Sequence, residues 1–583
     1  MRIQQFLLGI TLTLAFTSTT VRSAAQTFIR LVQPTREENN TSTPRQFISG
    51  RTCQGCKLSL NNDSIYVYPT GSFAIARTLT PGTSRFVLTA TDTTGKTYSR
   101  NINYYYNIPP APTATPIFRI DYLTVTPKGN LRIMEGDTIR IRMKGYPGCQ
   151  ASWINGTPIK ELPTSQTGGV PGIYAGSYVI TEADSTLQDS KLYIMLKSPD
   201  GSIATKESSN RYSFLQSEHP FVGRTIDNMT YLNIAPEGDR LGPDKLGYLD
   251  KNVLLEIAGQ VGDYYKVKLA PGEYAYVPEP LLDTATLDAA VPVSIVSQPR
   301  AWGDATHDYV SIQLSEKLPY LSTQDVNPGK ITVDVYGAYS EPGLQALPQG
   351  TKEISRVGFM QLAPNTFRIN IALQHRQPWG YQLYYEGNNL VIKVKRPPAS
   401  RTLSGLTIGL DAGHGGSNVG AMGPAGIYEK QLTLAITSLL KTALEKEGVR
   451  IITTRTRDQF FANEERLSFY RKANPDLLLS IHLNSAANPV DIKGTAVYYK
   501  HPFCQPLANA IYKRMQETGL SGFANNNNFN FILNNPTEFP DVLVETLFLS
   551  NPEDEMKALD PAFQQLMADK IVQGLKDFLA TSE

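Results

Sequence analysis

The segment LTIGLDAGHGGSNVGAMGPAGIYEKQLTLAI, residues 406–436, determines which class of fold the C-terminal third of the chain adopts. It begins with an apolar run typical of a buried strand, continues into a glycine-rich loop, and ends in the apolar spacing of an amphipathic helix. The loop carries His414, one of only six histidines in the chain, and Glu429 stands where the helix begins. A strand followed directly by a helix is the repeating unit of an α/β sheet.

The chain after residue 402 continues this alternation of strand and helix. Strands are expected at the runs VRIITTR, LLLSIHLN, GTAVYYK and VLVETLF, and helices at 430–447, 463–473, 504–518 and from 561 onward. Such alternation predicts a largely parallel sheet covered on both faces. We therefore assign residues 402–583 to one α/β domain.

Polar residues stand at the carboxyl ends of three predicted strands in this domain. His414 follows the first strand, His482 closes the run LLLSI, and Glu545 closes the run DVLV. Ligands of open α/β sheets bind beyond these ends, so the three side chains are expected to converge. Imidazole and carboxylate suit Zn²⁺, and a catalytic zinc site uses three protein ligands. The hypothesis is that His414, Glu429 and His482 bind the metal, which leaves Glu545 as the general base.

Each of these residues alone has a plainer interpretation. A histidine after a strand is more often a hydrogen-bonded structural residue, Glu429 could be a helix-start charge favoured by the dipole, and Glu545 could be an ion-pair partner. The metal hypothesis depends on all four together. Asp411 and Asn484 are candidates to orient the ligands from a second layer.

The motifs LDAGHGG, GIYEKQLTLAI, SIHLNS and VLVETLFLSN resemble those of the zinc-dependent N-acetylmuramoyl-L-alanine amidases, over residues 404–581. In that family the two histidines and the first glutamate bind zinc, and the glutamate of the last motif is catalytic. The resemblance implies the same roles for His414, Glu429, His482 and Glu545. It also implies cleavage of the amide bond between N-acetylmuramic acid and the L-alanine of the stem peptide. Two alternatives remain open, namely a zinc peptidase that cuts within the stem peptide and a non-catalytic wall-binding scaffold.

Two departures from the family pattern concern substrate contact and regulation. Many relatives carry an arginine near the place of Asn534, which makes Asn534 a candidate substrate contact. Some relatives insert a helix that plugs the zinc site after GTAVYY, and the sequence GTAVYYKHPFCQPLANAIY leaves no room for it. The domain is therefore expected to be active alone. His501 lies in this gap and is expected on the surface.

Upstream of residue 402 the sequence predicts four β-rich modules. Alternating apolar and polar residues with turn signals indicate an immunoglobulin-like module at 26–107 and a second β-sandwich at 117–213. Residues 218–283 resemble a bacterial SH3 module. Residues 291–396 resemble the β-sandwich targeting module often found ahead of cell-wall amidases, with a simple spacer as the alternative.

The N-terminal residues 1–25 are predicted to be a secretory signal peptide. Arg2 precedes the apolar run FLLGITLTLAF, and small residues at Ser23 and Ala25 favour cleavage. No stretch of the mature chain is long and apolar enough to cross a membrane. These features predict export to the periplasm or cell wall, where peptidoglycan is the expected partner, and they leave partner proteins open.

Composition excludes some other classes of function. The 583 residues are expected to form three to five domains, and 55 Lys and Arg nearly balance 53 Asp and Glu. This balance, with no basic cluster, argues against a nucleic-acid-binding protein. Cys53 and Cys56 form a lone C-x-x-C without a βαβ pattern, so a local disulfide or a small buried pair is expected there.

Overall fold

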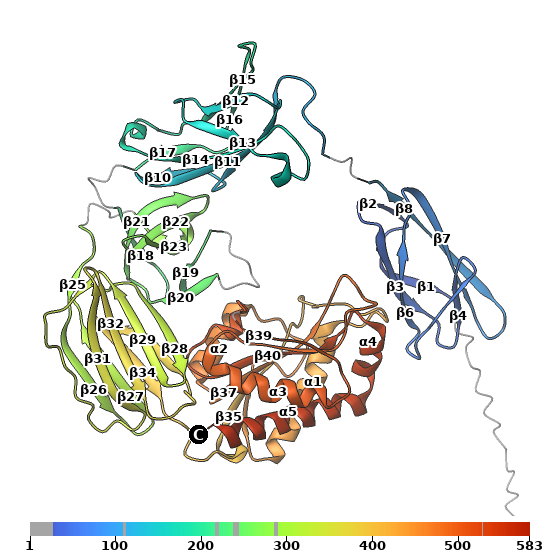
Figure 1. Ribbon diagram of the computed structural model, residues 1–583. Coiled ribbons are helices and arrows are strands. Elements are labelled where there is room, and N and C mark those ends of the chain that lie inside the picture. Colours follow the sequence, from blue (N-terminus) through green and yellow to red (C-terminus); the bar gives the residue numbers. More distant parts are fainter. Residues whose placement is uncertain are drawn as a thin grey trace, which may run out of the picture.

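The computed structural model describes residues 27–108, 112–215, 221–236, 244–284, 290–527 and 529–582. The predicted signal peptide lies outside the described residues. Within them the chain forms a series of β-rich units followed by one α/β domain, which confirms the predicted fold class (Figure 1). No helix among the described residues combines the length and the apolar character needed to cross a membrane.

The first unit consists of two sheets that enclose a small core around Ile48, Phe73 and Leu88. Their strand orders are β1-β3-β6 and β2-β8-β7-β4-β5. Cys53 and Cys56 form a disulfide between β3 and β4, as expected. The strands are β1 Ile29–Gln33, β2 Glu38–Thr41, β3 Arg45–Thr52, β4 Lys57–Leu60, β5 Asp63–Ile65, β6 Ser72–Thr78, β7 Gly82–Thr91 and β8 Thr97–Tyr106.

The second and third units share a sheet. Strands β10 and β17 lie before the predicted boundary at 213–218, yet β10 pairs with β21 of the next unit. The strands of the second unit are β9 Ile120–Thr126, β10 Leu131–Ile133, β11 Thr138–Gly145, β12 Gln150–Trp153, β13 Pro158–Glu161, β14 Ile173–Val179, β15 Tyr193–Lys197, β16 Ile203–Glu207 and β17 Tyr212–Phe214. Those of the third are β18 Phe221–Thr225, β19 Thr230–Asn233, β20 Lys245–Leu249, β21 Leu254–Val261, β22 Tyr264–Ala270, β23 Glu273–Pro278 and β24 Leu282–Asp283. Backbone hydrogen bonds therefore restrain the two units relative to each other.

The fourth unit packs two four-stranded sheets, β26-β27-β34-β33 and β28-β29-β32-β31. Phe367, Ile369, Ile371 and Leu373 of β32 all point into the core between them, as their alternation predicts. The same core continues into the third unit through Leu255 and Val267. The strands are β25 Ser294–Ile295, β26 Ser297–Gly303, β27 His307–Gln313, β28 Tyr320–Val326, β29 Gly329–Tyr336, β30 Ala338–Tyr339, β31 Ile354–Ala363, β32 Thr366–Leu373, β33 Tyr381–Glu386 and β34 Asn389–Lys395.

The α/β domain contains a six-stranded sheet in the order β36-β35-β37-β40-β38-β39. All neighbouring strands are parallel except β38 and β40, which are antiparallel. Its strands are β35 Thr407–Ala412, β36 Arg450–Thr453, β37 Leu477–Asn484, β38 Thr495–Tyr498, β39 Gly522–Asn526 and β40 Asp541–Phe548. Its helices are α1 Glu429–Lys446, α2 Asn463–Ala473, α3 Gln505–Gln516, α4 Pro552–Leu559 and α5 Pro561–Thr581, of which α4 was not expected from the sequence.

The two faces of this sheet are covered differently. Helices α1, α3 and α5 share the larger core with alternate residues of β35, β37 and β40. On the other face, Leu467 and Tyr470 of α2 form a smaller core, to which the third unit adds Met229 and Tyr248. The upstream β units therefore complete the cover of the sheet.

The first unit also returns to the α/β domain, beside α4 (Figure 1). Arg45 Nη2 lies 2.6 Å from Asp491 Oδ2, and Gln33 Nε2 donates to the carbonyl of Ala487 at 3.2 Å. Both members of the ion pair are about half exposed, and such pairs contribute about 0–1 kcal/mol. The contact positions the first unit near the loop after β37 without a large apolar interface.

Trp379, between β32 and β33, anchors the fourth unit to the α/β domain. It is 1% exposed, and its ring centroid lies 5.7 Å from that of Phe578 in α5. We expect Trp379→Ala to lower the free energy of unfolding of the α/β domain by about 3–5 kcal/mol, because it removes a large buried ring. Urea unfolding followed by the helical circular dichroism signal measures this loss.

Leu347→Ala is the control for this substitution, because Leu347 is 78% exposed. It is expected to change stability by no more than about 0.5 kcal/mol. A loss of under about 1 kcal/mol for Trp379→Ala would contradict the anchoring role.

Candidate metal centre

The loop after β35 adopts a conformation that few residues tolerate. His414 has φ = 62°, in the left-handed region, and Gly415 and Gly416 that follow also have positive φ. A Cβ on Gly415 would lie 2.2 Å from the carbonyl oxygen of Gln459, so only glycine fits there. A non-glycine residue in this region costs on the order of 1 kcal/mol or more, and persists only where its surroundings hold it.

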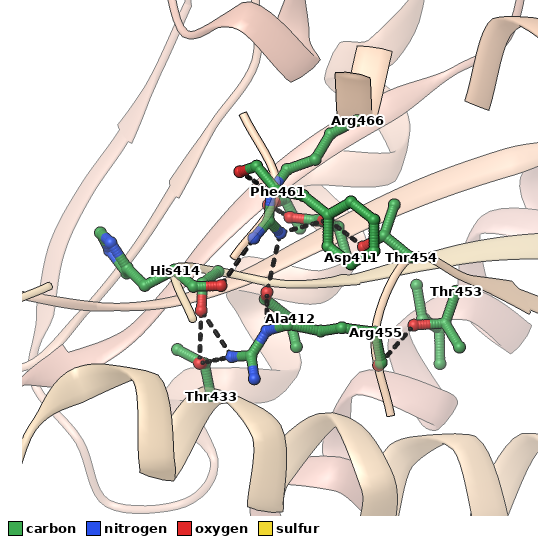
Figure 2. Close-up of polar contacts among 12 residues, drawn as sticks. Asp411, Ala412, His414, Thr433, Thr453, Thr454, Arg455, Phe461 and Arg466 are labelled. Atoms are coloured by element: carbon green, nitrogen blue, oxygen red, sulfur yellow. Dashed lines mark hydrogen bonds and ion pairs between the residues drawn. The ribbon is translucent and has the colours of Figure 1, made fainter. Parts of the chain in front are cut away.

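Two buried arginines hold this backbone (Figure 2). Arg466 donates to the carbonyls of Ala412 and His414 at 2.9 and 2.6 Å. Arg455 donates to the carbonyls of Ala412 and Gly413 at 2.8 and 2.7 Å, and also to the Thr433 hydroxyl of α1. Three consecutive carbonyl groups are thus fixed by guanidinium groups, which places the His414 side chain.

The structure brings His414, Glu429 and His482 together at the carboxyl end of the sheet. His414 Nε2 lies 3.0 Å from Glu429 Oε2, and His482 Nδ1 lies 3.0 Å from Glu429 Oε1. One ligand atom from each residue lies within 4.8 Å of the others. Glu429 is buried, whereas the two imidazoles are about one-fifth exposed, so the cluster opens toward solvent.

Hydrogen bonding around His414 indicates what belongs in the centre of the cluster. Asn418 Oδ1 can only accept, so the Nδ1 of His414 donates to it at 2.9 Å. The Nε2 lone pair of a neutral His414 then faces a carboxylate oxygen of Glu429, and both atoms are acceptors. A cation between them satisfies both, as a proton also would. Two imidazoles and one carboxylate around an opening to solvent fit a zinc ion.

The electrostatics of the three residues are consistent with a site for a cation. Burial opposes ionisation of Glu429, but His414 and His482 outweigh it and hold the pKa of this carboxyl far below its usual range. Burial likewise disfavours the charged form of His414, yet the hydrogen bond that its charged ring donates to the Glu429 carboxylate raises the pKa of His414. Positive charge beside Glu429 is therefore favoured despite the burial.

Glu545 lies beside this cluster on β40. In the parallel register it is paired with His482, and it is 9% exposed. Its Oε2 is buried and has no hydrogen-bond partner among the described residues. Burial, and then the charge of Glu429, raise the pKa of Glu545 well above its usual range. An unpaired buried carboxylate oxygen is costly, so it calls for a functional explanation.

The second-layer candidates lie in different surroundings. Asp411 is buried and accepts hydrogen bonds from Arg466, Thr454 and Ser480, so it orients the ligand loop through Arg466 and not through a histidine. Asn484 closes β37, and its side-chain oxygen accepts from the backbone of its own neighbour at 485.

Two expectations from the sequence are corrected here. Asn534 is 1% exposed and donates to Asp541 Oδ1 and to the carbonyl of Tyr498, so its amide is closed off from a substrate. His501 is not a surface residue. It is partly buried, it donates through Nε2 to the carbonyl of Asn535, and burial lowers its pKa to about 4. The neighbouring Lys500 donates to the carbonyl of Lys245, so the third unit packs against this region.

The sequence patterns did not single out Arg455, Arg466 or Asn418, which hold the loop and the ring of His414 by hydrogen bonds. Arg455 stands among polar residues in TRTRD, whereas Arg466 stands beside Leu467 in ERLSF. Arg466 directly precedes Leu467 on the buried side of α2, and a charge in that position requires a partner. This signal could have identified Arg466, but not the carbonyl groups that it binds.

Comparison with known proteins is informative for this domain. Residues 408–577 match the sequence model of a family described as N-acetylmuramoyl-L-alanine amidase, and form a domain of that kind. The chain is 32% identical over 195 residues to the probable cell wall amidase LytH of Staphylococcus epidermidis, and 34% identical over 194 residues to that of Staphylococcus aureus. Each match covers 33% of this chain and 65% of the relative, so the chain spans less than two thirds of these relatives.

Solved structures also match part of this chain. The N-acetylmuramoyl-L-alanine amidase AmiC2 of Nostoc punctiforme is 29% identical, with 30% of this chain and 97% of that chain covered and a TM-score of 0.29.

A substitution at Gly413 tests whether the close approach of the loop positions the ring of His482. A Cβ added at Gly413 would lie 2.3–2.7 Å from three atoms of the His482 ring, so Gly413→Ala displaces this ring. We expect the variant to bind zinc about 10–100-fold more weakly, as observed when the support of a metal ligand is disturbed. Competition with a chromophoric chelator measures the affinity.

Gly358→Ala is the matched control, because a Cβ there meets nothing nearer than 4.0 Å. It should leave zinc affinity unchanged. Equal affinities for both variants would show that His482 is not positioned by this approach.

Proposed function

We propose that the chain is an exported, zinc-dependent peptidoglycan hydrolase that cleaves the amide between N-acetylmuramic acid and L-alanine. The observation that carries the proposal is the facing pair of acceptors, His414 and Glu429, beside the unpaired oxygen of Glu545. The match of residues 408–577 to an amidase family supports the choice of bond. The names of the staphylococcal relatives support the cell wall as the place of action.

The metal would be held by His414, Glu429 and His482, with a further position toward solvent. Zinc bound in this way lowers the pKa of water to about 7 and polarises carbonyl groups. The protein's own contribution is geometric. Arg455 and Arg466 fix the loop, Asn418 fixes the ring nitrogen of His414, and the backbone amides of Ala421 and Leu483 fix the Glu429 carboxylate.

Glu545 serves as the general base in this proposal. Its unpaired Oε2 is free to accept a proton from a water beside the cluster. The same carboxyl group can then return the proton to the departing amine of L-alanine. A carboxylate that binds the metal cannot also accept and return a proton. The different environments of Glu429 and Glu545 therefore suit a ligand and a base, respectively.

The four upstream β units are proposed to place the enzyme on the wall. Tethering raises the effective concentration of a catalytic domain at an insoluble substrate. The shared sheet and shared core among the second, third and fourth units would present them as one rigid body.

A digest of purified sacculi tests the proposed bond. We expect the full chain to release stem peptides with a free L-alanine amino group and to leave intact glycan strands, and a chelator should stop the release. Mass spectrometry identifies the new ends. Fragments cut within the stem peptide would establish a peptidase instead, and the absence of any product would favour a binding scaffold.

Replacing Glu545 by glutamine tests whether this residue is the general base or a zinc ligand. Glu545→Gln keeps the shape of the side chain but cannot accept a proton, so kcat should fall by about 10²–10⁴ while zinc content stays at one per chain. Metal analysis and a kinetic assay on the same sample measure both quantities.

Glu555→Gln is the matched control, because Glu555 is also buried and its pKa is raised to about 8. This residue is already protonated at neutral pH, so the variant should keep both activity and zinc. Loss of zinc from Glu545→Gln would make Glu545 a ligand, and an unchanged kcat would make it a structural carboxylate.

A further inference from the structure

A cavity of about 760 Å³ lies between the fourth unit and the α/β domain. Its walls include residues of the fourth unit, of the linker at 396–401 and of the first residues of β35 and β36. The metal cluster lies at the carboxyl ends of the parallel strands, whereas Thr407 and Arg450 begin β35 and β36. The cavity is therefore at the opposite edge of the sheet and is separate from the candidate metal centre.

The charged residues that line this cavity are mostly positive. Five Lys and Arg side chains stand against a single carboxylate, that of Asp476. Asp476 pairs with Lys395 at 3.2 Å, and Arg396 pairs with the buried Asp308 at 2.7 Å. These two cations are neutralised and are held in place by their partners.

Three cations of the cavity remain without a carboxylate. Lys352, Arg401 and Arg450 have no ion pair within the part of the chain that the structure describes. They come from the fourth unit, the linker and the α/β domain respectively, so the cavity gathers them from three separate segments. Burial, with the nearby Lys393 and further cations of the cavity wall, lowers the pKa of His307 to about 4, which is consistent with a positive potential there.

We propose that this cavity binds a soluble phosphate-bearing ligand with several negative charges, such as a short phosphodiester or oligophosphate chain. Guanidinium groups bind phosphate oxygens through paired hydrogen bonds, and an ammonium group adds a further positive charge. The volume is within the range of pockets that enclose small ligands and exceeds the space that one phosphate needs. A recessed site favours a ligand that can enter it over the flat surface of a membrane.

Such a ligand would bridge the fourth unit and the α/β domain. Lys352 and Arg450 belong to different folded units, and Pro397 and Pro398 lie in the short linker between them. A ligand that contacts both units stabilises their mutual arrangement, because it binds only where both cations are close.

Calorimetric titration of the zinc-loaded full chain with sodium tripolyphosphate tests the site. Saturable binding of one ligand per chain is expected, weakened by added salt. The triple variant K352Q/R401Q/R450Q should bind at least about 30-fold more weakly, because each charge-assisted hydrogen bond contributes severalfold to affinity. If the triple variant does not fold, Arg401→Gln alone should still weaken binding severalfold.

The matched control likewise removes one lysine and two arginines, from exposed positions elsewhere. K57Q/R132Q/R224Q should bind tripolyphosphate as the parent chain does, since these side chains are exposed on the upstream units. Equal weakening in both triple variants, or no saturable binding by the parent chain, would overturn the proposal.

Vesicles distinguish a soluble ligand from a lipid headgroup. Sedimentation with phosphatidylglycerol vesicles, and with phosphatidylcholine vesicles for comparison, is expected to show no binding that depends on Lys352, Arg401 and Arg450. Binding to phosphatidylglycerol that these three residues control, without binding of tripolyphosphate, would overturn the soluble ligand and assign the cavity to a membrane headgroup.

Discussion

The candidate metal centre depends on two buried guanidinium groups that bind three consecutive backbone carbonyls. Arg455 and Arg466 are both 3% exposed, and burying a charge is costly unless it is fully hydrogen-bonded. The carbonyls of residues 412–414 and the carboxylate of Asp411 meet this requirement. In return, the arginines hold His414 in a left-handed conformation that it would otherwise avoid.

The candidate metal centre has two nearby carboxylates, Glu429 and Glu545, whose pKa values are shifted in opposite directions. Glu429 accepts hydrogen bonds from two backbone amides and lies between two histidines, so it remains ionised. Glu545 has no partner for one oxygen, and the charge of Glu429 adds to the cost of ionising it. Pairs of titratable groups with separated pKa values are typical of sites that combine binding with proton transfer.

The β units upstream are more closely joined to the α/β domain than a row of independent modules would be. Strand β10 extends the sheet of the third unit, and Trp379 reaches the core of the α/β domain. Met229 and Tyr248 of the third unit contribute to the cover of the sheet beside α2. The α/β pattern predicts that helices cover both faces of the sheet. On the face beside α2, the third unit supplies part of this cover.

The amino-acid sequence by itself determined the class of fold and indicated which polar residues gather at the candidate metal centre. Period-two and helical apolar patterns are local, so they predicted the α/β domain and the positions of α1, α2, α3 and α5. Strand ends predicted where His414, His482 and Glu545 would converge. The roles of Arg455 and Arg466, the burial of Asn534 and His501, and the sheet shared across the predicted boundary were decided only by the tertiary structure. The physical reason is that burial and hydrogen-bond partners depend on segments far apart in the chain, and no local pattern records which segment will cover a given side chain.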